Sequence, residues 1–519
     1  MLKRLTLILL LPLIFMVFVA CSNAPKTSSE QKFRLTTLKL AGGMDWGAPN
    51  PYLHDPRGPG VAKMKLIFDS LLEADENGII SWLAQDWFRE GNVYTFILHE
   101  QARFHDGHPL TAADVAFTLD YYQQYPPVTN YLTIDGKSIV EKYEVLDERT
   151  ISITVHKPMA TTLTALGSFV ILPKHIWEKV EDPYTYSAPE AFIGSGPYKF
   201  GDYEAATGSY EFLGHEQYYG AKAVAERLLF VPVSDPLLAF ENGDIDLTEV
   251  PIDTMEKYKN APGIGMIGKD NDMGYKLLIN METLNLFKDV KYRAAVYHAL
   301  NRQEIVDKVF RGSGAVGSAG YVPPTNYFYN ENVQKYDYNP EAAGALLREY
   351  ELSLQLLAAN TSDDVKIAEL IKNDLAAVGV NVEVIAVDSK IRDEKVFDGE
   401  YELALVGNGG WGRTPDYLRT LYSSKSKFTG TNPHYMGPLG YDNERITELA
   451  EAQLFEMDFD KRKELLQELQ AEISKEIPIV VVATKTTYVM FRKDYYDGWV
   501  KTYDYQQLEQ NRLSYVEKQ

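Results

Sequence analysis

Alternating hydrophobic and polar residues mark the strands of the first half of the chain. Residues 93–99 alternate and are rich in β-branched and aromatic side chains, which is typical of a strand with one buried face. Residues 35–40 show the same pattern near the start of the chain. Residues 140–146 and 150–156 alternate on either side of the turn Asp147-Glu148-Arg149, so they predict a pair of strands.

The second half of the chain carries short apolar segments, which predict buried strands at residues 274–280, 353–357, 380–387, 403–407 and 477–483. Between two of them, residues 364–378 have a helical period and end at Gly379. This β-α-β order favours a mixed α/β fold. Further helical patterns predict one helix from Lys288 through Val306 and one long helical region over residues 446–475.

One helix has a clear start signal at Thr111. Asp114 stands three residues later, where each side chain can bond the other residue's free backbone N–H in a capping box. Before it lies the turn His105-Asp106-Gly107-His108, which has two interpretations. Two imidazoles and a carboxylate could bind a metal, or the segment is a polar turn in which Gly107 supplies a positive φ.

These elements resemble the signature of the family 5 extracellular solute-binding proteins of ABC importers, which bind peptides or nickel. The matching segments, in order, are Tyr94-Thr95-Phe96, Phe104-His105-Asp106-Gly107, Pro109-Leu110, Thr111-Ala112-Ala113-Asp114-Val115 and Gly194-Ser195-Gly196-Pro197-Tyr198. His99 departs from the family, which usually carries Arg or Lys there. In this family the turn is structural, so the resemblance implies no metal at His105 and His108.

The resemblance implies a two-lobed periplasmic-binding-protein-like α/β fold (cluster C) with mixed sheets. The expected parts are residues 33–72, 194–272 and 485–519 as the first lobe, 73–193 as its inserted subdomain and 273–484 as the second lobe. A solute would bind between the lobes, which close on a hinge, and a membrane permease would receive it. We expect a monomer without enzymatic activity or cofactor.

The N-terminus has the features of an export signal. Lys3 and Arg4 precede an apolar segment from Leu5 to Val19, which is short for a membrane span. Cys21 is the single cysteine of the chain. Taken alone it could be a small buried side chain or a reactive thiol. Its position resembles a bacterial lipobox, which implies a signal peptide over residues 1–20, a diacylglyceryl anchor on Cys21 and a flexible tether over 21–32.

Composition and charge exclude few classes of protein. The 519 residues are 45% hydrophobic and 24% charged, as in ordinary globular proteins, and the net charge is −21. Such acidity argues against binding nucleic acid. The chain has no G-x-x-x-x-G-K-[ST], H-E-x-x-H or G-x-S-x-G motif. Residues 312–317 match G-x-G-x-x-G, but they follow a helix where a nucleotide site would need a strand.

Two segments are candidates for contact with the solute. Residues 50–60 contain three prolines and predict a loop without regular structure; Trp46, Tyr52 and Arg57 in and beside it either contact the ligand or pack locally. The second segment follows the strand at 403–407 and contains Trp411, Arg413, Asp416 and Tyr417. Peptide-binding members carry an Asp shortly after Gly-Trp, but here Arg413 stands in that short loop and Asp416 comes later.

The identity of the solute stays open at this point. Arg413 suits a carboxylate, because its planar guanidinium can form two parallel hydrogen bonds. A peptide is the leading interpretation. A nickel or other metal chelate is the alternative, since nickel-binding members use arginines, aromatics and a histidine in the second lobe, and His434 lies in a comparable region. Sugars and other solutes, or a secreted glycosidase with paired carboxylates, are less favoured.

Overall fold

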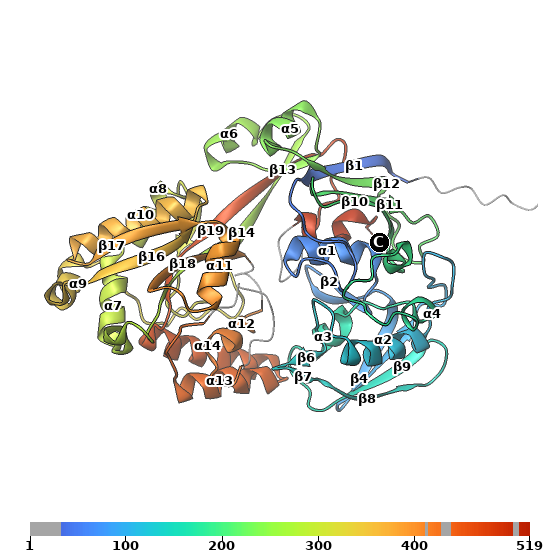
Figure 1. The fold of residues 1–519 in the computed structure, drawn as a ribbon, viewed down its shortest axis with the longest axis horizontal. Coiled ribbons are helices and arrows are strands. Elements are labelled where there is room, and N and C mark those ends of the chain that lie inside the picture. Colours follow the sequence, from blue (N-terminus) through green and yellow to red (C-terminus); the bar gives the residue numbers. More distant parts are fainter. Residues whose placement is uncertain (1–32, 410–413, 427–436, 502–507, 519) are drawn as a thin grey trace, which may run out of the picture. The chain divides into compact units, whose positions relative to one another are not determined.

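The structure is a computed structural model that describes residues 33–409, 414–426, 437–501 and 508–518 (Figure 1). The side chains of residues 271 and 272 are not part of this description. Three predicted ligand residues, Trp411, Arg413 and His434, lie outside the described residues, as does Cys21. Among the described residues, no helix is both long and apolar enough to cross a membrane.

One mixed sheet of eleven strands contains most of the predicted strands. In spatial order it contains β10 (Tyr198–Glu204), β11 (Ser209–Gly214), β12 (Ala225–Pro232), β1 (Leu35–Gly42), β13 (Leu247–Glu249), β19 (Val480–Arg492), β14 (Ile264–Ile279), β18 (Leu403–Gly409), β16 (Ser353–Ala359) and β17 (Asn381–Val387), while β15 (Gly314–Val316) pairs with β19. β1 runs parallel to β12, and β16 runs parallel to β17. The predicted β-α-β unit is therefore confirmed.

Residues 84–155 form a separate antiparallel sheet. Its order is β4 (Ala84–Glu90), β5 (Val93–Leu98), β9 (Thr150–Val155) and β8 (Val140–Val145), and it is accompanied by the small hairpins β2–β3 (Leu72–Asp75, Gly78–Ser81) and β6–β7 (Thr133–Ile134, Lys137–Ser138). α2 (Ala112–Gln124) begins with the predicted capping box, because the Thr111 N–H donates to Asp114 Oδ2 at 2.9 Å. The predicted strands and the start of the helix are confirmed here.

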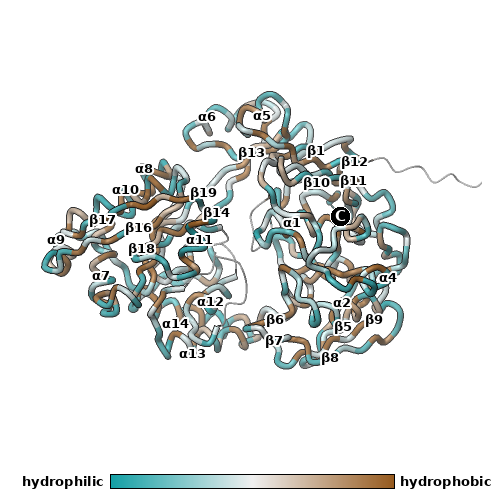
Figure 2. Tube along the Cα trace, viewed as in Figure 1, coloured by the Kyte–Doolittle hydropathy of each residue, from teal (hydrophilic) through white to brown (hydrophobic). Residues whose placement is uncertain are grey.

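The remaining helices follow the chain. Around the first part lie α1 (Gly58–Ile67), α3 (Thr162–Ser168), α4 (Lys174–Trp177), α5 (Pro236–Asn242) and α6 (Met255–Tyr258). Later come α7 (Val290–Ala299), α8 (Arg302–Lys308), α9 (Pro340–Leu347), α10 (Ser362–Ala377), α11 (Ser389–Phe397), α12 (Tyr417–Tyr422), α13 (Glu444–Phe455) and α14 (Phe459–Glu476). Figure 2 shows that hydrophobic residues gather on the strands that these later helices cover.

Separate hydrophobic cores define two lobes. The first lobe packs β1, α1 and the antiparallel sheet around residues such as Leu38, Phe68 and Phe96. The second lobe has cores on the two faces of its sheet, one around Leu277 and Leu356 and the other around Leu278 and Val406. β14 and β19 run between the lobes, and their long antiparallel ladder shifts register between Lys269 and Met273 (Figure 1).

Four sequence predictions of element bounds are wrong. Residues 50–60 were expected to lack regular structure, but α1 begins at Gly58, because Pro59 sits in the first turn, where a helix needs no N–H donor. The helix expected through Val306 ends at Ala299, and Asn301 caps α8 by accepting from the Glu304 N–H at 3.2 Å.

The other two differences concern helices α13 and α14 and strand β14. The long helical region at 446–475 is two helices, because Asp458 caps α14 by accepting from the Lys461 N–H at 3.0 Å. β14 begins at Ile264, ten residues before the predicted start at Gly274, because glycines and the charged Lys269 and Asp270 interrupt the apolar pattern of its first half, which nevertheless pairs along β19. Residues 314–316 within the G-x-G-x-x-G match form strand β15, so no helix follows to bind a phosphate.

Candidate functional site

The loop before α1 is held rigidly against the first lobe. The Trp46 N–H donates to the Tyr210 hydroxyl at 2.7 Å, and the Trp46 carbonyl accepts from the Asp55 N–H at 2.7 Å. Gly60 has to be glycine, because a Cβ there would lie 2.2 Å from the Asp55 carbonyl oxygen. The half-buried indole of Trp46 therefore sits on a fixed backbone.

Tyr52 belongs to the core of the first lobe. Its side chain is 4% exposed, and its hydroxyl donates to the Tyr125 carbonyl at 2.9 Å. Its ring contacts Tyr121, Tyr122 and Trp177, with ring centroids 5.4–6.2 Å apart. Burial, followed by these neighbouring tyrosines, raises the pKa of Tyr52 far above its usual range. The Tyr52 hydroxyl is thus already hydrogen-bonded within the first lobe.

Arg57 reaches from the first lobe to the second. It stands at the N-cap of α1, and its Nη2 lies 3.3 Å from Asp393 Oδ2 on α11. Asp393 also accepts from Arg392 Nε at 2.7 Å, and Arg392 donates to the Leu405 carbonyl at 2.8 Å. The result is a chain of alternating charges across the two lobes. Arg57 is one of the ligand residues predicted from the sequence, whereas Asp393 and Arg392 were not among them.

Asp416 and Tyr417 lie at the start of α12. Asp416 forms an ion pair with Arg462 of α14. The ring of Tyr417 is buried and lies 5.6 Å from that of Tyr321. Both side chains therefore contribute to the structure of the second lobe, next to the segment that contains Trp411 and Arg413.

A cavity lies elsewhere, at the hairpin β6–β7. It has a volume of about 1020 Å³, and its walls include Asp120, Asn130, Lys142, Lys157, Lys425 and Phe455. Its lining joins the first lobe to residues of the second. None of the described candidate ligand residues, Trp46, Tyr52, Arg57, Asp416 or Tyr417, lines it.

A sequence model of the bacterial extracellular solute-binding proteins, family 5 (middle region), matches residues 78–430. The chain belongs to this family. The dipeptide-binding protein of Escherichia coli strain K12 is 26% identical over 462 residues, which cover 80% of this chain and 83% of that protein. Heme-binding protein A of Haemophilus influenzae is 24% identical over 495 residues, which cover 88% of each chain.

Solved structures confirm the two-lobed fold of this solute-binding protein. DppA from Helicobacter pylori, in complex with the peptide STSA, has a TM-score of 0.77 at 24% identity and covers 95% of this chain and 100% of its own. NikZ from Campylobacter jejuni, in complex with Ni(L-His), has a TM-score of 0.76 at 21% identity and covers 94% and 100%. The resemblance seen in the sequence motifs is thereby confirmed.

The family turn after β5 is built around a half-buried histidine, His105. His105 Nε2 lies 3.0 Å from the Gly196 carbonyl oxygen, and the Gly194 N–H donates to His105 Nδ1 at 3.3 Å. This contact joins the Phe104-His105-Asp106-Gly107 turn to the Gly194–Tyr198 motif. His105 is therefore structural, as the resemblance implies.

We expect this solute-binding protein to lose stability between pH 7 and pH 5. Burial, above all, lowers the pKa of His54 to about 4, of His105 to about 3 and of His215 to about 4. Below about pH 6.5 the unfolded chain binds protons that the folded chain excludes, so each histidine costs roughly 1–2 kcal/mol by pH 5. Urea unfolding of the chain and of His54→Gln, at both pH values, measures this. An equal pH dependence in both would contradict the role of His54.

A second contact between the lobes lies at the hairpin β6–β7. Arg419 of α12 pairs with Asp135 of the hairpin, with Nη1 and Oδ1 3.3 Å apart, and its Nε lies 2.9 Å from Glu451 of α13. Beside it, the Ala160 N–H donates to the Leu454 carbonyl at 2.8 Å. Neither Arg419 nor Asp135 stood out in the sequence, since single charged residues carry no periodic signal.

Replacing Arg419 by alanine is expected to loosen this hairpin. The change leaves two carboxylates without their shared cation and costs about 1–3 kcal/mol at the contact. Amide hydrogen exchange should accelerate in residues 133–138 and stay unchanged in β16 and β17. Unchanged exchange in the hairpin would mean that the ion pair does not hold it.

Proposed function

We propose that this protein is the substrate-binding lipoprotein of an ABC importer, which captures a peptide-like solute between its lobes and delivers it to a membrane permease. The family match over residues 78–430 carries the proposal. Relatives named as dipeptide-binding or di/tripeptide-binding proteins support the choice of a peptide. The proposed function is binding and delivery, without an enzymatic reaction.

The lobes would close by rotating about a hinge in β14 and β19. The two strands are paired on both sides of the register shift between Lys269 and Met273, so the ladder is weakest at that point. Lys269 is anchored there by Glu249, with Nζ and Oε1 2.9 Å apart. A hinge in two neighbouring strands allows the lobes to rotate while the pairing on either side persists.

The contact between Arg57 and Asp393 suggests how the ends of a peptide are held. Both groups carry full charges, and they lie on opposite lobes. A zwitterionic peptide can replace this pair by offering its carboxylate to Arg57 and its α-amino group to Asp393. We propose Trp46, Arg57 and Asp393 as ligand residues, together with the segment that contains Trp411, Arg413, Asp416 and Tyr417. Tyr52 would contribute by supporting the loop.

Native mass spectrometry of the soluble chain from Ser22, purified gently from rich medium, tests the function. A series of adducts at peptide masses supports a peptide binder. A single adduct containing a metal favours the metal-chelate alternative and would bring His434 into the site. Release of a chemically altered product would instead indicate an enzyme.

A defined peptide library adds a second measurement to this test. A peptide at 100 times its Kd should stabilise the protein by about 2.7 kcal/mol without being changed. If no di-, tri- or oligopeptide raises the unfolding temperature, the peptide assignment fails.

The lipid anchor is a separate part of the proposal. We expect Cys21→Ala to abolish lipid attachment and to leave the protein out of the membrane fraction, because no other thiol is present in the chain. Membrane fractionation with mass spectrometry of the N-terminal peptide measures this. Retention of the variant in the membrane would contradict a diacylglyceryl anchor on Cys21.

A further inference from the structure

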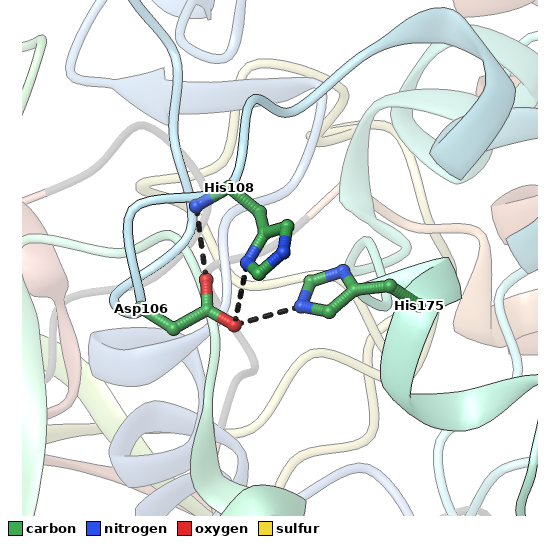
Figure 3. Close-up of side chains that lie close together, drawn as sticks. All are labelled: Asp106, His108 and His175. Carbon is green, nitrogen blue, oxygen red and sulfur yellow. Dashed lines mark hydrogen bonds and ion pairs between the residues drawn. The ribbon is translucent and has the colours of Figure 1, made fainter.

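Three side chains converge on one point at the surface of the subdomain that contains α2 and α4 (Figure 3). His175 Nε2 lies 2.7 Å and His108 Nδ1 lies 3.1 Å from the same atom, Asp106 Oδ2. The two imidazole rings stack on each other with centroids 3.9 Å apart. All three donor atoms lie within 4.8 Å of one another.

The turn that carries Asp106 and His108 has a fixed shape. Gly107 adopts a φ of +91°, which few side chains tolerate, and its N–H donates to the Phe104 carbonyl at 2.9 Å. The His108 N–H donates to Asp106 Oδ1 at 3.1 Å. Because this bond occupies one carboxylate oxygen, the other oxygen, Oδ2, is directed at the imidazoles.

His175 is held in place by a different part of the chain. It lies on the short helix α4, where the Lys174 N–H donates to Asp114 Oδ1 at 3.1 Å. Trp177, the last residue of α4, is fully buried and anchors this helix. The ring of Phe104 packs edge-on against His175 with centroids 5.8 Å apart. Both halves of the cluster are therefore preorganised by backbone contacts.

We propose that Asp106, His108 and His175 form a binding site for a divalent late transition metal such as Zn²⁺. Two imidazole nitrogens and one carboxylate oxygen are a common three-ligand set for zinc, with water as the fourth ligand. Bond lengths of about 2.0–2.2 Å in a tetrahedral site place neighbouring ligand atoms ~3.3 Å apart. The distances of 2.7 and 3.1 Å from Asp106 Oδ2 to the two imidazole nitrogens need only a small spreading, and the two nitrogens, which lie within 4.8 Å of each other, can be brought together by rotation of the exposed His108 ring.

The site differs from the one that the sequence suggested. In the sequence, His105 and His108 were the obvious pair, but His105 faces the Gly194–Tyr198 motif. His175, 69 residues away from Asp106, takes the place of His105. The Asp106 and His175 side chains are 23% and 30% exposed, so a metal can enter from solvent. A bound metal would cross-link the turn to α4 and stiffen this subdomain.

Zinc titration by calorimetry tests the site, using the full-length chain in detergent, free of a polyhistidine tag and stripped with EDTA. We expect one strong zinc equivalent. His108→Ala and His175→Ala should each weaken it by more than the roughly 10–100-fold that loss of an outer hydrogen-bond partner costs. Co²⁺ in place of zinc should give the visible absorption of a tetrahedral site in the unaltered chain.

Two controls separate this site from other histidines. His156→Ala removes an exposed histidine of the same subdomain and should bind zinc as the unaltered chain does. His434→Ala removes the candidate for a metal chelate, so loss of the zinc equivalent in that variant would place the zinc at the solute site and overturn the proposal. The proposal is overturned if the unaltered chain binds no zinc, or if the double variant His108→Ala/His175→Ala binds it unchanged.

Discussion

Replacing Arg512 by alanine is expected to destabilise the first lobe by roughly 3–5 kcal/mol, because the buried carboxylate of Asp69 loses its cation and Glu73 keeps only Lys65. Arg512 is 3% exposed. Its Nη1 lies 3.3 Å from Asp69 Oδ1, and its Nε lies 2.6 Å from Glu73 Oε2. Burial raises the pKa of Asp69, while Lys65 and Arg512 outweigh burial and lower the pKa of Glu73.

The Arg512 guanidinium forms hydrogen bonds with several segments of the first lobe. Its remaining N–H groups donate to the carbonyls of Lys65 and Phe68 and to the Ser70 hydroxyl. Asp69 also accepts from the Trp82 indole at 2.7 Å and from the hydroxyls of Tyr218 and Tyr219. Removal of the arginine therefore leaves several buried acceptors without their donor.

Chemical denaturation, followed by tryptophan fluorescence and circular dichroism, measures the effect of Arg512→Ala. The matched control is Arg445→Ala, because Arg445 pairs with Glu448 and Glu468 on the exposed faces of α13 and α14 and should hardly change stability. Equal denaturation midpoints for the two variants would show that the Arg512 network does not stabilise the lobe.

Trp411→Ala is expected to abolish solute binding and leave the fold intact. Trp411 follows β18 in a glycine-rich segment, and the described structure places the end of β18 beside the hinge: Gly409 pairs with Met273, just past the register shift of β14. An aromatic anchor at such a position typically contributes 2 kcal/mol or more to binding. We therefore expect at least about a 30-fold loss of affinity.

Isothermal titration with a peptide identified by mass spectrometry measures this loss. Phe88→Ala is the control, because Phe88 is a large aromatic side chain that is 47% exposed on the outer sheet of the first lobe. Its affinity for the peptide should equal that of the unaltered chain. Retained affinity in Trp411→Ala would place the solute site elsewhere.

The sequence predicted those parts of the fold that follow a hydrophobic period or a family motif. The capped helix α2, the strands β5, β8 and β9, and the unit of β16, α10 and β17 all have such a signal. Breaks inside amphipathic segments were missed, at Leu300 and at residues 456–458. There a side-chain cap interrupts the helix, while the hydrophobic pattern continues across the break.

The candidate site was harder to predict, because charged residues build part of it. Helix α11 was missed altogether: its buried face consists of Arg392, Asp393 and Val396, while Ile391 and Phe397 are exposed. This is the reverse of the usual amphipathic pattern. Asp393 pairs with Arg57 and Arg392 pairs with Asp364, and these ion pairs hold that face. Such contacts join residues far apart in the sequence, so they can be identified only in the three-dimensional structure.

The position of Arg512 also decides the order in which the lobes can form. The second lobe is continuous in the chain between β14 and β19, whereas the first lobe combines β1 with β12 and then with residues near the C-terminus. The ribosome adds Arg512 more than 400 residues after Asp69 and Glu73, so these two carboxylates lack this partner during most of synthesis. We expect the nascent chain to complete its second lobe first and to keep the first lobe loose, and hence open to threading through a secretion pore, until synthesis ends.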